Sequence, residues 1–185
     1  MKLPAQRMNE VVQQVEQEGV VACPAEAVWG LTCDPLSEDA VLQLLAMKHR
    51  PISKGLIIVA ASSAMFGPLL KPLDSAQRNE LELSWPGPNT WLVPNRGLYP
   101  DWITGESDEI AIRVTSAPAL ALLSYRLGRP VVSTSANPAG AQPARHSFQV
   151  VRYFGRGLVR APGVVDLEAS PSTIRRVGTG EVLRA

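Results

Sequence analysis

The sequence predicts a single α/β domain over residues 1–185, in which helices cover a mixed sheet. Short apolar runs typical of strands alternate with amphipathic segments typical of helices, and the C-terminal part is rich in strands. A chain of 185 residues fits one domain. With 45% hydrophobic and 19% charged residues, it has the composition of a globular protein that buries a core without a disulfide or metal staple.

Five segments are expected to form helices: residues 8–18, 37–48, 74–84, 117–127 and 146–154. In the first of them, apolar residues recur at helical spacing on one face. Ser37 is a good N-cap for the second, which ends near Lys48 because Pro51 disfavours helix just before it. Asp74 and Gln77 form a capping-box pattern at the start of the third.

Eight short apolar or β-branched runs are expected to form strands: residues 20–23, 55–60, 90–93, 110–114, 130–134, 164–165, 172–177 and 181–183. Residues 24–34 and 85–88 follow neither the helical nor the strand period, so we expect loops there. Residues 178–180, Gly-Thr-Gly, are expected to form the turn that joins the last two strands.

Charge and composition exclude several classes of protein. The net charge of +1 argues against a strongly basic nucleic-acid binder, although not against a local basic patch. No run approaches the ~20 apolar residues of a membrane span, and the polar N-terminus is unlike a signal peptide, so we expect a cytoplasmic protein. Cys23 and Cys33 are expected to be free thiols. His49 and His146 lack the spacing of a metal site, so none is expected.

A cationic cluster follows the second helix, where Lys48, His49 and Arg50 are joined by Lys54. One interpretation is that these charges complement the helix dipole and are solvated outside it. The other is phosphate binding, because lysine and arginine together neutralise a polyphosphate and arginine binds phosphate in a bidentate manner. The sequence contains neither of the Gly-rich fingerprints of Rossmann or P-loop nucleotide binding.

Polar groups also gather at strand ends. Residues 133–137, Ser-Thr-Ser-Ala-Asn, follow a buried strand, where α/β proteins place ligands. Residues 85–90, Trp-Pro-Gly-Pro-Asn-Thr, are a rigid connection or a preset wall of a pocket. Arg113 lies in an apolar strand and must be exposed or paired in a cleft. Glu26 and Asp34 flank a loop and could bind a magnesium–nucleotide, although loop carboxylates are common.

Taken together in chain order, seven motifs resemble the YrdC-like family of threonylcarbamoyl-AMP synthases. The resemblance runs from about residue 8 to the C-terminus and matches the short, single-domain bacterial form. No single motif is decisive, but their order is highly specific. They are the Pro-Ala-Glu-Ala-Val-Trp-Gly-Leu of residues 24–31, Lys-His-Arg-Pro of 48–51, Lys-Gly-Leu-Ile of 54–57, Trp-Pro-Gly-Pro-Asn-Thr of 85–90, Ile-Arg-Val of 112–114, Ser-Thr-Ser-Ala-Asn of 133–137 and Pro-Ser-Thr-Ile of 171–174.

The resemblance implies a twisted open sheet with a concave, positively lined cavity. It implies a nucleotidyltransferase that converts L-threonine, bicarbonate and ATP, with Mg²⁺ on the ATP, to threonylcarbamoyl-adenylate and pyrophosphate. The adenylate would then feed the downstream machinery that modifies adenosine 37 of tRNA. No tightly held protein metal and no covalent enzyme intermediate are implied, and the sequence identifies no general base.

The resemblance also implies roles for individual side chains. Lys48 and Arg50 would be catalytic, because they would stabilise charge on the phosphoryl oxygens. The ATP would be held by Lys48, Arg50, Ser135 and Asn137. Threonine would be held by Lys54, Thr90, Arg113, Ser133 and Ser172, with Arg113 on its carboxylate.

One departure from the family pattern concerns the first motif. The family usually has threonine where this chain has Ala25, and Thr32 stands where glycine is common. Loss of a buried hydroxyl bond would weaken threonine recognition by about 1–2 kcal/mol. A divergent paralogue that acts on another amino acid therefore stays open. A second alternative is a module of the same fold that binds double-stranded RNA or tRNA, with the cationic cluster as a patch that contacts phosphates.

Overall fold

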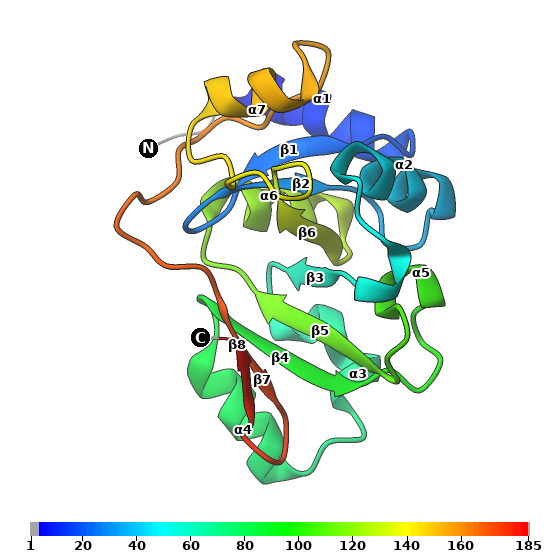
Figure 1. The fold of residues 1–185 in the computed structure, drawn as a ribbon. Helices are drawn as coiled ribbons and strands as arrows, with labels where there is room; N and C mark the ends of the chain where they lie inside the picture. The colour runs from blue at the N-terminus through cyan, green and yellow to red at the C-terminus, as the bar shows by residue number, and fades with distance from the viewer. Residues whose placement is uncertain (1–3, 185) are drawn as a thin grey trace.

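The fold is built on one mixed sheet, and the structure, a computed structural model, describes residues 4–184 (Figure 1). Its strands are β1 (Val21–Pro24), β2 (Trp29–Thr32), β3 (Ile57–Ala60), β4 (Asn89–Pro94), β5 (Glu109–Val114), β6 (Val131–Ser135), β7 (Thr173–Arg176) and β8 (Val182–Arg184). They lie in the order β1-β2-β6-β3-β5-β4-β7-β8. The pairs β3–β5 and β4–β7 are parallel and the others are antiparallel, which confirms the predicted open mixed sheet.

Helices cover both faces of this sheet (Figure 1). The α-helices are α1 (Ala5–Glu16), α2 (Glu38–Lys48), α3 (Gly67–Leu70), α4 (Ser75–Ser84), α5 (Asp101–Thr104), α6 (Pro118–Leu127) and α7 (Ser147–Phe154), and the short 3₁₀ helices are η1 (Ile52–Lys54) and η2 (Ser63–Phe66). Local capping chemistry sets their ends as predicted. The Ser37 hydroxyl accepts from the backbone N–H of Ala40 at 3.3 Å, and Asp74 and Gln77 make a reciprocal capping box.

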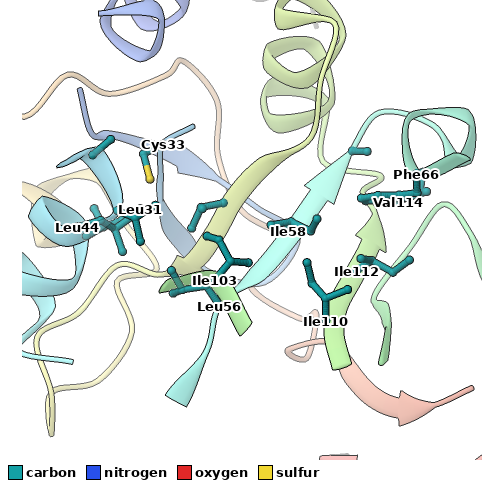
Figure 2. Close-up of a cluster of buried hydrophobic side chains, with 14 of the residues drawn as sticks. Leu31, Cys33, Leu44, Leu56, Ile58, Phe66, Ile103, Ile110, Ile112 and Val114 are labelled. Carbon is teal, nitrogen blue, oxygen red and sulfur yellow. The ribbon is translucent and has the colours of Figure 1, made fainter. Parts of the chain in front are cut away.

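Two hydrophobic cores lie on opposite faces of the sheet. Figure 2 shows the larger one, in which Leu44 from α2 and Ile103 from α5 pack with strand residues such as Ile58 and Ile112. Helices α1 and α6 close the other face over β1, β3 and β6. Each core buries one free cysteine, Cys23 in the α1–α6 core and Cys33 in the larger core, and burial raises the pKa of both thiols. No helix within residues 4–184 is long and apolar enough to cross a membrane.

Two secondary-structure predictions are wrong. Residues 29–32, expected to lie in a loop, form β2, because this segment is fully buried and pairs with β1 and β6. Residues 164–165, expected to be a strand, lie in an irregular segment, and Val164 is 78% exposed. The remaining predicted elements are present, with boundaries that differ by a few residues. The short helices η1, η2, α3 and α5 were not predicted, because they are single turns without a periodic apolar face.

Candidate active site

A cleft of about 490 Å³ lies over one face of the sheet, where the alternate residues Glu109, Ala111 and Arg113 of β5 line it. We call it the main cleft. Its walls come from the β1–β2 loop, η1, β5, β6 and the C-terminal segment. Six of the side chains expected to bind substrates line it: Arg50, Lys54, Arg113, Ser133, Ser135 and Ser172. Two elements distant in sequence, η1 and β8, therefore contribute to one cavity.

Lys48 lies in the wall behind this cleft and not among its lining residues. Its side chain is buried, and the ammonium donates to the carbonyl oxygens of Ser135 and Asn137, the latter at 2.9 Å. Burial and the nearby charge of Arg50 lower the pKa of Lys48 to about 8. The interpretation of the cationic cluster as solvated charge is thus wrong for Lys48. Its ammonium instead stabilises the C-terminal end of β6 and the residues that follow it.

Arg50 and Lys54 are held in the main cleft by close contact between η1 and the end of α5. The Arg50 guanidinium donates through Nη2 to the carbonyl oxygens of Gly55 at 2.8 Å and Lys54 at 3.2 Å. Gly55 has a φ of +57°, and a Cβ there would lie 2.8 Å from the carbonyl oxygen of Thr104. Only glycine fits this turn, so the sequence Lys-Gly at 54–55 fixes where the two cationic side chains lie.

Arg113 pairs with Glu26 in a way that the sequence did not reveal. Arg113 is 6% exposed, and its Nη1 donates to Oε2 of Glu26. The other oxygen of that carboxylate accepts from the hydroxyl of Thr115 at 2.7 Å and from the backbone N–H of Ser116 at 3.0 Å. Burial disfavours the charged carboxylate, but the charge and hydrogen bond of Arg113 outweigh this, so the pKa of Glu26 is lowered.

The C-terminal segment completes the end of the cleft at which Arg113 lies. The hydroxyl of Thr90, a buried residue, donates to Oγ of Ser172 at 2.9 Å. Arg184 on β8 donates through Nη2 to the carbonyl oxygen and Oγ of Ser172, at 2.8 and 3.0 Å. Arg184 lines the cleft, and burial together with the charge of Arg113 lowers its pKa. Sequence analysis missed Arg184, since only the β7–β8 pairing brings it there.

The remaining candidates are placed as follows. Asn137 donates through Nδ2 to the carbonyl oxygens of Ala141 at 2.8 Å and Pro138 at 3.1 Å, so it fixes the turn after β6. Ala25 lines the main cleft, whereas Thr32 is fully buried and outside its lining. Asp34 pairs with Arg129 at 2.9 Å, so the two carboxylates considered for a magnesium–nucleotide are each held by an arginine.

Together, the open mixed sheet and the arginine-lined cleft define an α/β protein with a cationic cleft, a kind of site suited to an anionic small molecule. Residues 13–185 match the family model Sua5_yciO_yrdC, which carries the description "Telomere recombination". The chain therefore belongs to the Sua5/YciO/YrdC family, as the seven motifs predicted.

Two similar proteins carry the same enzyme name. The threonylcarbamoyl-AMP synthase of Cellvibrio japonicus is 50% identical over 179 residues, which cover 96% of this chain and 95% of that protein. The synthase of Stutzerimonas stutzeri is 48% identical, with 96% of each chain covered. Among solved structures, Sua5 of P. abyssi complexed with L-threonine superimposes with a TM-score of 0.86 at 26% identity, over 96% of this chain and 52% of that one.

Proposed function

We infer that this chain is a threonylcarbamoyl-AMP synthase, which forms L-threonylcarbamoyl-adenylate and pyrophosphate from L-threonine, bicarbonate and ATP. The observation that carries this function is the identity of 50% and 48% to two synthases over nearly their whole length. The main cleft supports it, because it gathers Arg50, Lys54 and Arg113 with serine hydroxyls in one cavity. A module that only binds RNA is disfavoured by the same similarity.

The chemistry needs two steps and no covalent enzyme intermediate. The amine of threonine attacks bicarbonate and water leaves, which gives a carbamate. An oxygen of the carbamate then attacks the α-phosphorus of ATP, and pyrophosphate leaves. The protein's contribution is to orient the three substrates and to stabilise charge on the phosphoryl oxygens.

We assign the ATP phosphates to Arg50, which lines the cleft and makes no ion pair with any residue in 4–184, and to Lys48, whose buried ammonium lies in the adjoining wall. Ser135 and Asn137 at the end of β6 contact the nucleotide. Arg113 binds the threonine carboxylate, with Lys54, Thr90, Ser133 and Ser172 around the amino acid.

We propose that Mg²⁺ binds together with ATP and is not held by protein side chains alone. Within residues 4–184 no three His, Cys, Asp or Glu side chains gather as a metal site, and Glu26 and Glu109, the acidic residues of the cleft, each pair with an arginine. When bound, Mg²⁺ neutralises charge on the leaving pyrophosphate.

The reaction class is nucleotidyl transfer. We further propose that the enzyme works in the cytoplasm, where its product feeds the machinery that modifies adenosine 37 of tRNA.

Pyrophosphate release tests the assignment directly. The purified protein is assayed with ATP and Mg²⁺, with and without threonine and bicarbonate. We expect release only when all substrates are present. Release that depends on another amino acid would instead support the divergent paralogue. No release with any amino acid, from a folded protein that binds ATP, would refute the function.

A further inference from the structure

The Arg113 guanidinium is only half used by the protein. Its Nη1 is taken by Glu26, whereas within the described residues neither Nε nor Nη2 has a hydrogen-bond acceptor, and Nε is buried. The side chain is 7% exposed, so these donors have little access to water. Nη2 is not among the buried atoms of this group, and Arg113 lines the main cleft, so a ligand in the cleft could accept from it and complete the guanidinium.

The free donors are the ones that match a carboxylate. On a guanidinium, Nε and Nη2 share one edge and present two parallel N–H groups, which bind the two oxygens of a carboxylate side by side. Glu26 occupies the other side of the group. Because Glu26 accepts from Nη1, the Nε–Nη2 edge of Arg113 is the one left available to a ligand.

Glu26 is itself held rigidly. Besides Arg113, its carboxylate accepts from Thr115 and Ser116 immediately after β5, and its carbonyl oxygen accepts from the backbone N–H of Asp166 at 2.8 Å. It also stands between the main cleft and a second cavity of about 540 Å³, both of which it lines. Because Arg113, Thr115 and Ser116 all donate to this carboxylate, it holds the Arg113 guanidinium in one orientation.

The charges at this end of the cleft differ from those around η1. Arg113 and Arg184 lie near one another, and the carboxylate of Glu26 offsets one of their two charges. By contrast, Arg50 and Lys54 make no ion pair with any residue in 4–184. A polyphosphate is drawn to the uncompensated pair, while the end with Glu26 suits an anion of a single charge.

We propose that Glu26 is a positioning residue of the synthase. It turns the Nε–Nη2 edge of Arg113 toward the cleft, and its charge makes this subsite select an amino-acid carboxylate over a phosphate. The proposal deepens the function proposed above and rests on it.

The first test is Glu26→Gln, which keeps the size of the side chain and removes its charge. We expect the KM for threonine to rise about tenfold or more, while kcat at saturating threonine and the Kd for ATP change by less than about threefold. The matched control is Glu181→Gln, which makes the same change in an ion pair with Arg176 at an exposed site outside the cleft lining. It should leave the threonine KM unchanged.

The second test separates charge from geometry. Inorganic phosphate is added at increasing concentration while threonine is varied. We expect phosphate to compete with threonine in Glu26→Gln but not in the wild type, because the arginines are then uncompensated. Glu26→Asp keeps the charge on a shorter stem, so it should raise the threonine KM and still exclude phosphate. Competition in the wild type as well would overturn the selection by charge.

If Glu26 had only a structural role, Glu26→Gln would weaken the binding of both threonine and ATP and lower the melting temperature. An unchanged threonine KM in Glu26→Gln, or an equal loss of ATP and threonine binding, overturns the proposal. If Glu26→Gln does not fold, Thr115→Val decides, since it keeps the charge of Glu26 and removes the hydrogen bond from the Thr115 hydroxyl, together with the one that this hydroxyl accepts from the backbone N–H of Ala117. We then expect a rise of about threefold in the threonine KM alone, and no rise refutes the positioning role.

The variant Arg113→Lys distinguishes a failure of the Glu26 proposal from a failure of the proposed function. If the wild type releases pyrophosphate only with threonine and Arg113→Lys raises the threonine KM, the proposed function stands whatever Glu26→Gln shows. If the wild type has no threonine dependence, the proposed function itself fails.

Discussion

Replacing Ala25 with threonine introduces a hydroxyl at the position where the resemblance described above leads us to expect one. Ala25 is 9% exposed and lines the main cleft directly beside Glu26. Its φ is not positive, so a β-branched residue fits the backbone there. A hydroxyl at this wall meets substrate in a partly dry site, where a polar pair discriminates better than a methyl contact does.

The expected effect is on threonine and not on ATP, because Ala25 lies at the Glu26–Arg113 end of the cleft. One hydrogen bond gained in such a site corresponds to a roughly tenfold lower apparent constant for threonine, or about 1.4 kcal/mol. The constant for ATP should stay the same.

The assay is pyrophosphate release against threonine concentration, for the wild type, Ala25→Thr and Ala25→Val. Valine has the shape of threonine without the hydroxyl, so it separates hydrogen bonding from filling of space. An equal gain with valine, or no gain with threonine, would refute the reasoning. Thr32 does not supply the hydroxyl in place of residue 25, because it is fully buried and outside the cleft lining. Serine tested in place of threonine as substrate shows whether the pocket accepts another amino acid.

Four further predictions follow from the site and the core. Arg50→Ala should weaken ATP binding in calorimetry by about 1.5–3 kcal/mol through loss of a charged phosphate contact, and unchanged affinity in a variant with native circular dichroism would contradict the assignment. Alkylating reagents should leave activity unchanged under native conditions, because Cys23 and Cys33 are buried thiols with raised pKa values; a marked loss would disprove this. The pKa of Glu26 in the folded protein is below its usual value of 4.5, so the stability that its carboxylate contributes is present above pH 4.5 and is lost as the pH falls through the folded pKa. In urea titrations at decreasing pH, Glu26→Gln should therefore lose less stability than the wild type, and equal losses would count against the Glu26–Arg113 ion pair. Gly105→Ala should lower the free energy of unfolding by about 1–3 kcal/mol, because φ is +66° and a Cβ would lie 2.4 Å from a carbonyl oxygen of η1, and unchanged urea denaturation would show that the contact relaxes at no cost.

Local chemistry in the sequence was sufficient to predict most of the fold. The N-cap at Ser37 and the capping box at Asp74 depend only on residues within one helical turn, and both are present. Strand β2 was missed because Trp29–Thr32 has no period of its own and becomes a strand by pairing with β1 and β6. Val164 was misassigned for the converse reason, since its apolar run has no strand beside it.

The candidate site shows the same division. The motif around Arg50 and Lys54 could be found from sequence, because one short turn carries both charges. The partner of Arg113 and the place of Arg184 could not, because they depend on contacts between distant strands. No local sequence pattern indicates that Lys48 is buried or that its ammonium donates to carbonyl oxygens.

The contacts that shape the cleft join residues far apart along the chain, and this has a consequence for folding kinetics. Lys48 and Ser135 are 87 positions apart, as are Glu26 and Arg113, and Thr90 and Ser172 are 82 apart. Closing such long loops is slow, so the cleft is completed only when nearly the whole sheet has formed. Ligands that need the finished cleft cannot accelerate that assembly. They stabilise the native chain by slowing its unfolding, so saturating threonine and ATP lengthen the lifetime of the folded state while the refolding rate stays the same.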